Sequence, residues 1–273
     1  MRLINTKTLE FEEFVSPPPY AILSHTWGPE ETSYQDFQHP ETRTRQQGFQ
    51  KILMTCKLAQ ADGLQLAWVD TCCIDKTSSA ELSEAINSMF KWYQRAAICY
   101  AYLPGVQQKE DHLDRRSTFA RSRWFTRGWT LQELIAPAKI CFFGVGWARL
   151  GDKTELESAI HNITRIDKDV LRGGSLNDIS VARRMSWASR RQTTREEDIA
   201  YCLMGIFDIN MPMLYGEGKK AFIRLQEEIF KETGDESLFA WKASINSAPF
   251  RGIFADSPTE FGHSADIIPF RDL

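Results

Sequence analysis

The chain has 273 residues, 25% of them charged, and a formal net charge of −3. This length can bury a substantial core, while the acidic balance argues against a protein built to coat nucleic acid. No apolar run approaches the roughly 18–20 residues of a membrane span, and the N-terminus carries acids where a secretory signal would be apolar. We therefore expect a cytoplasmic protein with no membrane span and no nucleic-acid partner.

Four compact apolar segments predict β-strands covered on both faces, because they show little strict alternation. In chain order they are YAILSHTW (Tyr20–Trp27), QLAWVDTCC (Gln65–Cys73), AICYAYL (Ala97–Leu103) and AKICFFG (Ala138–Gly144). Apolar residues at helical spacing occupy 49–59 and 82–93, the second opened by a predicted capping box of Ser78 and Glu81. This alternation predicts an α/β fold with a mostly parallel central sheet flanked by helices.

After about Gly151 the strand signal fades and four segments have helical patterns, at 153–164, 180–191, 196–207 and 218–233. Thr194 and Glu197 predict a further capping box. We predict an α/β core over 1–150 and a mainly helical extension over 151–273, packed together as one integrated domain. The abrupt end suggests the N-terminal portion of a longer protein.

The six cysteines lie mostly in apolar segments, and none forms a C-x-x-C pair. Reduced, buried thiols and no metal site are therefore expected. The sequence contains no G-x-S-x-G, P-loop or G-x-G-x-x-G motif, which argues against hydrolase, NTPase and dinucleotide-dehydrogenase sites of those types.

Polar residues follow the first two predicted strands, where doubly wound sheets bind ligands. Ser24, His25 and Trp27 end the first strand. His25 is either a general base or sugar or phosphate ligand, or a histidine bonded within the turn. Asp70 either binds a ribose hydroxyl or caps the following turn. Cys73 is either a nucleophile paired with His25 or, more commonly for adjacent cysteines in an apolar strand, a packing residue.

A third motif, SRWFTRGWTLQELIAP (Ser122–Pro137), places Trp129 and Glu133 on one helix face, opposite the aliphatic face. Either a second layer of protein covers that face or it lines a pocket. A desolvated carboxylate there would stabilise an oxocarbenium ion during glycosidic cleavage. Alternatively, Glu133 pairs with an arginine such as Arg127 and ties the helix down. Arg127 is also a candidate phosphate ligand.

These motifs, YAILSHTWG (20–28), WVDTCCIDK (68–76) and RGWTLQELIAP (127–137), together resemble the fungal heterokaryon-incompatibility (HET) domain. The later helical segments and GIFADSPTEF (252–261) also resemble that family. The resemblance implies a filamentous fungus, nonself recognition or innate immunity, and programmed cell death. It also implies a receptor module, either C-terminal to this domain or separate.

A weaker resemblance connects SRWFTRGWTLQEL (122–134) with the S-x-W-C-x-x-E-L stretch of plant TIR domains. It implies a TIR-like core and assigns Glu133 to the cleavage of NAD+, which is then a substrate rather than a cofactor. His25 and Trp27 are not TIR signatures, and the helices after Gly151 have no TIR counterpart, so the pocket and substrate can differ.

Two hypotheses follow from these observations. In the first, the chain is a cell-death effector that hydrolyses NAD+ or a related nucleotide, with Glu133 catalytic and self-association on activation. Substrate binding is then predicted for Ser24, His25, Trp27, Asp70, Cys73, Arg127 and Trp129. In the second, the chain is a non-enzymatic signalling module that recruits partners by self-association. The arginine runs at 115–127 and 183–195 would suit nucleic-acid binding or cleavage, but the acidic balance does not.

Overall fold

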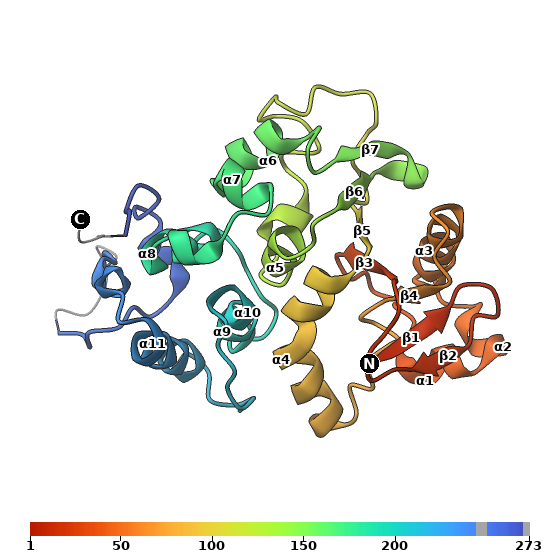
Figure 1. Ribbon diagram of the computed structural model, residues 1–273, viewed down its shortest axis with the longest axis horizontal. Helices are drawn as coiled ribbons and strands as arrows, with labels where there is room; N and C mark the ends of the chain where they lie inside the picture. Colours follow the sequence, from red (N-terminus) through yellow and green to blue (C-terminus); the bar gives the residue numbers. More distant parts are fainter. Residues whose placement is uncertain (244–249, 270–273) are drawn as a thin grey trace. The chain divides into compact units, whose positions relative to one another are not determined.

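The computed structural model describes residues 1–243 and 250–269. Its described strands form one seven-stranded sheet in the order β2-β1-β4-β3-β5-β6-β7 (Figure 1). They are β1 (Arg2–Asn5), β2 (Phe11–Glu13), β3 (Ala21–His25), β4 (Leu66–Trp68), β5 (Ile98–Tyr102), β6 (Ile140–Phe143) and β7 (Arg149–Asp152).

The sheet is mixed, which corrects the prediction of a mostly parallel one. The four predicted strands are present as β3, β4, β5 and β6, and each pairs in parallel with its neighbour. However, β1 runs antiparallel to both β2 and β4, and β7 runs antiparallel to β6. These added strands have three or four residues each, too few to display a periodicity that sequence inspection can recognise.

The parallel strands have the order β4-β3-β5-β6, so β4 lies on one side of β3 and β5, the next strand in the chain, lies on the other. Right-handed crossovers in opposite directions place their helices on opposite faces of the sheet. These helices are α3 (Phe49–Ala61) and α4 (Ser79–Arg95), drawn on either side of β3 and β4 in Figure 1. The sheet between them is deeply buried, with every residue of β3 and β4 buried.

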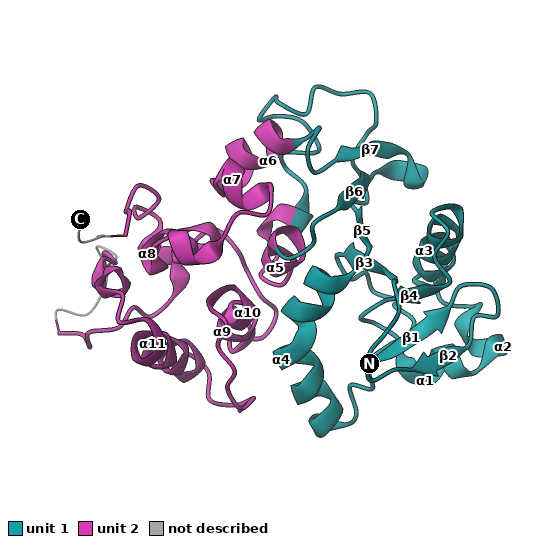
Figure 2. Ribbon diagram, viewed as in Figure 1, with its two compact units in different colours: residues 1–124, 136–156 teal, residues 125–135, 157–273 magenta. Residues whose placement is uncertain are grey.

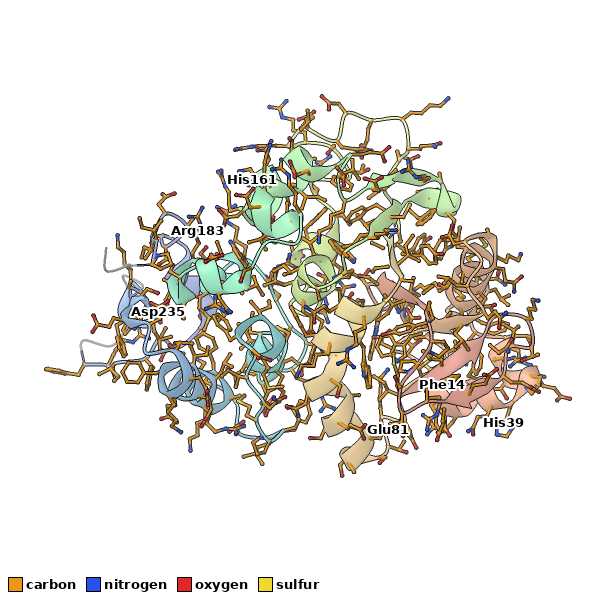
Figure 3. The ribbon with its side chains drawn as sticks, viewed as in Figure 1. Phe14, His39, Glu81, His161, Arg183 and Asp235 are labelled. Atoms are coloured by element: carbon orange, nitrogen blue, oxygen red, sulfur yellow. The ribbon has the colours of Figure 1, made fainter. Side chains whose placement is uncertain are left out.

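Helix α4 begins as the sequence predicts, with Ser78 as its N-cap. The Ser78 side chain accepts a hydrogen bond from the Glu81 amide at 3.3 Å. The Glu81 carboxylate, labelled in Figure 3, accepts instead from the Asp75 amide at 2.8 Å and from Arg2 Nη1 at 2.7 Å. Only the serine half of the predicted capping box therefore forms, because β1 supplies a stronger, charged partner for the glutamate.

The chain divides into two compact units (Figure 2). Unit 1 comprises residues 1–124 and 136–156 and contains the whole sheet. Unit 2 comprises 125–135 and 157–273, so the third motif's helix α5 (Thr130–Ile135) groups with the helical part of the chain. That the core and the extension form one integrated domain stays a prediction.

Each helical pattern predicted after Gly151 contains at least one helix. In unit 2 the helices after α5 are α6 (Glu157–Thr164), α7 (Lys168–Leu171), α8 (Val181–Ala188), α9 (Asp198–Tyr201), α10 (Met204–Phe207) and α11 (Lys220–Thr233). Unit 1 also contains two short helices, α1 (Tyr34–Gln38) and α2 (Pro40–Arg43). Short 3-10 segments are η1 (Arg123–Thr126), η2 (Val145–Trp147), η3 (Leu176–Asp178), η4 (Glu236–Phe239) and η5 (Pro258–Phe261).

The start of α8 is capped by residues that lie far along the chain. Ser180 accepts from the Arg183 amide at 3.3 Å, and the Asp235 carboxylate accepts from the Val181 amide at 2.8 Å; Arg183 and Asp235 are labelled in Figure 3. Placing an acid at a helix N-terminus also complements the helix dipole. The α8 start is therefore tied to the segment that follows α11.

The predicted capping box of Thr194 and Glu197 is wrong. Glu197 immediately precedes α9 as its N-cap residue rather than lying in its first turn, and its own side chain makes no capping hydrogen bond. The Glu197 carboxylate instead accepts hydrogen bonds from the Gly216 amide at 2.7 Å and the Gly218 amide at 3.1 Å. A long-range contact with the MPMLYGEG loop therefore replaces the local motif.

The cysteines, all within the described residues, are unpaired, and five of them are buried as predicted; Cys141 is half-buried. Desolvation raises the pKa of the Cys72 thiol well above its usual value, and neighbouring Cys73 adds to this rise. Such thiols are protonated and unreactive at neutral pH.

Candidate functional site

Three of the predicted site residues meet where β3 and β4 end. His25 Nε2 lies 3.1 Å from Asp70 Oδ1, and the Trp27 indole Nε1–H donates to Asp70 Oδ2 at 2.8 Å. β3 and β4 are adjacent and parallel, so the residues at their carboxyl ends emerge at the same edge of the sheet. In open α/β sheets this edge is where ligands bind.

Asp70 is an ionised acceptor at this edge. Desolvation acts to raise its pKa, but hydrogen bonds from His25 and Trp27 together with the charge of Lys76 hold the pKa below its ordinary value. A carboxylate has about four lone-pair positions, of which these two bonds use two. Asp70 therefore retains acceptor capacity for a hydroxyl group of a ligand.

Trp27 forms an exposed aromatic surface beside that carboxylate. Its side chain is 47% accessible although its indole N–H is fixed on Asp70. Lys76 Nζ lies 3.9 Å from the centre of the Trp27 ring, a cation–π contact. We refer to Trp27, Asp70 and Lys76 as the Trp27 platform.

The opposite end of the His25 ring contacts Lys51 of α3, with 3.1 Å between Lys51 Nζ and His25 Nδ1. Lys51 also donates to the Thr26 carbonyl at 3.3 Å and makes a very short ion pair with Glu31. Both ring nitrogens of His25 are thus engaged by other side chains, and the ring is buried.

Ser24 and Cys73 face the interior rather than this edge. Ser24 is fully buried, and its hydroxyl oxygen accepts from the Trp124 indole N–H at 2.8 Å. Cys73 is buried, and its sulfur accepts from the Val69 amide at 3.4 Å. Neither geometry presents the side chain to a ligand, and the contacts of Cys73 and His25 do not form a thiol–imidazole pair.

The third motif forms α5 in unit 2, and all six of its residues are buried, including Glu133 at 6% and Gln132 at 1% accessibility. Trp129, just before the helix, is half-buried and hydrogen-bonds to the Asp198 carboxylate of α9. Protein therefore covers Glu133, whereas Trp129 on the same face stays partly accessible.

A buried arginine that sequence inspection did not single out holds α5. Arg191 Nη1 donates to the Arg127 carbonyl at 2.7 Å and to the Thr130 hydroxyl at 2.9 Å. Burial lowers the pKa of Arg191 to about 10, and the nearby Glu133 carboxylate opposes that decrease. Arg191 is therefore charged at neutral pH and lies in the field of Glu133.

Arg127, the candidate phosphate ligand of the motif, contacts Thr194. Its guanidinium Nη1 and Nη2 both lie 3.2 Å from the Thr194 hydroxyl, to which they donate. Its neighbour Gly128 donates from its amide to the Gln192 carbonyl at 2.9 Å. A Cβ at position 128 would lie 2.5 Å from a Thr193 methyl carbon, so any larger residue would displace the Thr193 side chain. Residues 191–194 thus form a cradle for the start of α5.

The structure therefore brings together His25, Trp27 and Asp70 in unit 1, and places Arg127, Trp129 and Glu133 in unit 2. Sequence inspection missed Lys51, Glu31 and Arg191. Lys51 borders the buried stripe of α3, where a lysine is common, and Arg191 lies within an arginine run whose pattern is typical of an amphipathic surface helix.

The described part of the chain lacks two other kinds of feature. No group of three or more His, Cys, Asp or Glu side chains is arranged to hold a metal ion among residues 1–243 and 250–269. Within the same residues, no helix combines the length and the apolar character required to cross a bilayer.

Comparison with known proteins gives matches at both ends of the chain. Residues 20–118 match the family model described as Heterokaryon incompatibility protein (HET), and residues 220–266 match a domain of unknown function (DUF8212). The Vegetative incompatibility protein HET-E-1 of Podospora anserina is 52% identical over 224 residues. That match covers 80% of this chain but 16% of the relative. No solved structure matches.

Proposed function

Since this chain belongs to the heterokaryon-incompatibility (HET) family, we propose that it acts in fungal incompatibility as a module that triggers cell death. We further propose that it does so by hydrolysing the N-glycosidic bond of NAD+ or a related nucleotide. The name of its relative, a vegetative incompatibility protein, supports the first part. The second part rests on the site chemistry that follows.

The Trp27 platform is the observation that supports the proposal of a nucleotide ligand. It combines an exposed indole that can stack on a planar ring, an ionised carboxylate with free acceptor capacity, and an ammonium group. These features match a base or nicotinamide ring, a ribose hydroxyl and a phosphate, respectively. Its position at the carboxyl ends of two parallel strands is the usual nucleotide-binding position of such sheets.

Glu133 is the residue that we propose for the cleavage step. When the bond between C1′ of the ribose and the nicotinamide nitrogen breaks, its electron pair leaves with the ring, which becomes neutral nicotinamide. The ribose becomes an oxocarbenium ion that water attacks, with release of a proton. A buried carboxylate stabilises that cation strongly because few water molecules screen it.

The test is turnover of NAD+ by the purified 273-residue chain at high protein concentration, comparing wild type with Glu133→Gln. We expect the glutamine variant to lose activity about a hundredfold or more, the usual effect of removing one group that stabilises transition-state charge. Glu197→Gln is the matched control, since Glu197 is also a buried acid of unit 2 but binds the amides of Gly216 and Gly218.

Circular dichroism and urea unfolding establish that both variants are folded. Undiminished NAD+ turnover by a folded Glu133→Gln variant would contradict the catalytic role of Glu133. A Trp27→Ala variant tests nucleotide binding separately, in unit 1, through the dissociation constant for NAD+.

One observation favours a second candidate function, a non-enzymatic signalling module. Helix α5 is buried over its whole length, and Trp129, Arg127 and Arg191 are engaged in contacts within unit 2. The motif can therefore serve to hold the fold while self-association recruits partners. This candidate predicts that expression of Glu133→Gln kills cells as effectively as wild type while the purified chain leaves NAD+ intact.

A further inference from the structure

We infer that Lys51 is a positioning residue for the Trp27 platform, acting through the His25 ring and the loop after β3. No motif includes Lys51, which lies one residue before the buried Ile52 on α3. The inference concerns the platform's geometry, and its consequence for nucleotide affinity rests on the proposed function.

All three protons of the Lys51 ammonium group have acceptors. They are His25 Nδ1 at 3.1 Å, the Thr26 carbonyl at 3.3 Å and a Glu31 carboxylate oxygen in a very short ion pair. The lysine side chain is largely buried, so these bonds face little competition from water. An ammonium group with every donor used has a defined position rather than the usual mobility of a surface lysine.

This arrangement determines the tautomer of His25. Lys51 can only donate, so His25 Nδ1 must be the unprotonated ring nitrogen that accepts. The proton of a neutral imidazole then lies on Nε2, where it donates to Asp70 Oδ1 at 3.1 Å. If Nδ1 carried the proton, Nε2 would present a lone pair to the Asp70 carboxylate and two donors would face each other at 3.1 Å. Lys51 thus directs the histidine to donate to Asp70.

The same lysine anchors the loop on both sides of Trp27. Lys51 binds the carbonyl of Thr26, which precedes the tryptophan, and it binds Glu31. The oxygen of Glu31 that pairs with Lys51 also accepts from the amide of Gly28, which follows the tryptophan, at 2.6 Å. Trp27 is therefore exposed but held at its backbone by these contacts and at its indole by Asp70.

Gly48, at the start of α3, belongs to the same arrangement. A Cβ at position 48 would lie 2.7 Å from the Glu31 Cα and 2.8 Å from the Glu30 carbonyl oxygen, distances that real Cβ atoms do not show. The Gly48 amide donates to that carbonyl at 2.8 Å. Close packing of α3 against the loop therefore places Glu31 within reach of Lys51.

The first test uses the wild-type chain and needs no substitution. Long-range ¹H–¹⁵N correlation spectra at neutral pH report which nitrogen of each imidazole carries the proton, with His25 assigned by its absence in His25→Gln. We expect the Nε2–H tautomer. An Nδ1–H tautomer or a doubly protonated ring would overturn the inference.

The second test compares Lys51→Met with Lys57→Met, an exposed lysine on the same helix. In Lys51→Met we expect mixed His25 tautomers and faster hydrogen exchange of the Trp27 indole N–H, by about tenfold, as expected when one charge-assisted hydrogen bond is lost. Lys57→Met should match wild type in both measurements. A Lys51→Met variant with an unchanged tautomer and unchanged exchange would overturn the inference.

Gly48→Ala keeps every charged group but displaces Glu31, so it provides a second route if Lys51→Met does not fold. It should also accelerate Trp27 exchange, and no change would count against the inference. These readouts are taken without a nucleotide, so the inference can fail or hold independently of NAD+ binding. With NAD+ present, we expect Lys51→Met to weaken binding about tenfold.

Discussion

At the residue scale, the chain buries several cations, and each has a structural consequence. Lys153, just after β7, is 5% accessible and donates to the Pro137 carbonyl at 3.0 Å. Burial lowers its pKa from 10.5 to about 8, with a smaller opposing effect from Cys99. The folded chain therefore holds this proton less tightly than the unfolded chain does.

This pKa difference predicts how stability depends on pH. Between about pH 8 and 10.5 the unfolded state binds more protons at Lys153 than the folded state, so the free energy of unfolding should rise across that window. Lys153→Met should lack this rise. Urea unfolding of both proteins at closely spaced pH values measures it, and parallel pH profiles for the two would refute the prediction.

Arg191 is the second informative cation at this scale. Replacing it with methionine leaves the Arg127 carbonyl and the Thr130 hydroxyl without their charged donor. We expect a loss of about 2–4 kcal/mol in the free energy of unfolding, as for breaking other buried charged contacts. The adjacent Arg190 is exposed, so Arg190→Met should change stability by only a few tenths of a kcal/mol. Similar values for the two variants would contradict a structural role for Arg191.

At the element scale, the helices of unit 1 are determined largely by local signals. Helix α4 buries Ala85, Ile86, Met89 and Tyr93 on one stripe, and its N-cap serine lies where the sequence pattern places it. Helix α5 is different, because it has six residues, all buried, and no described N-cap. A helix this short is stabilised by the contacts of its surroundings, here the cradle formed by residues 191–194.

The Ser78 cap gives a prediction at this scale. Ser78→Ala removes the acceptor for the Glu81 amide and should cost about 1 kcal/mol of stability. Ser79→Ala, at the first helical position of α4, provides the matched control and should be close to neutral. Thermal or urea unfolding decides the matter. Equal stabilities of the two variants would mean that water replaces the serine at no cost.

At the scale of the whole molecule, the candidate chemistry is divided between two units. The Trp27 platform belongs to the sheet of unit 1, and Glu133 belongs to unit 2 together with the cradle that holds it. The chain spans 16% of the length of its incompatibility relative. The net charge of −3 opposes association between copies only weakly.

We expect activation to require self-association. The prediction is that NAD+ turnover per chain rises with protein concentration, and that sedimentation velocity detects larger species over the same range. Mass action favours the associated state as concentration increases, so the two curves should coincide. Turnover per chain that stays constant while the chain remains monomeric would contradict this expectation.

The fold was predictable to the extent that its signals are local. Apolar runs identified β3, β4, β5 and β6, and helical spacing identified α3 and α4. The edge strands β1, β2 and β7 escaped prediction because three or four residues carry no readable period. Their antiparallel pairing made the sheet mixed.

The candidate site shows the same division. The sequence by itself placed His25, Trp27 and Asp70 after the first two predicted strands, because apolar runs show where those strands end. Only the tertiary structure decided that β3 and β4 are neighbours, that Lys51 contacts His25 Nδ1, and that Arg191 lies in the field of Glu133. The physical reason is that these contacts join residues far apart in the chain: Lys51 and His25 are 26 positions apart, and Arg191 binds the Arg127 carbonyl 64 positions away. Chain closure and burial, rather than periodicity, select such partners.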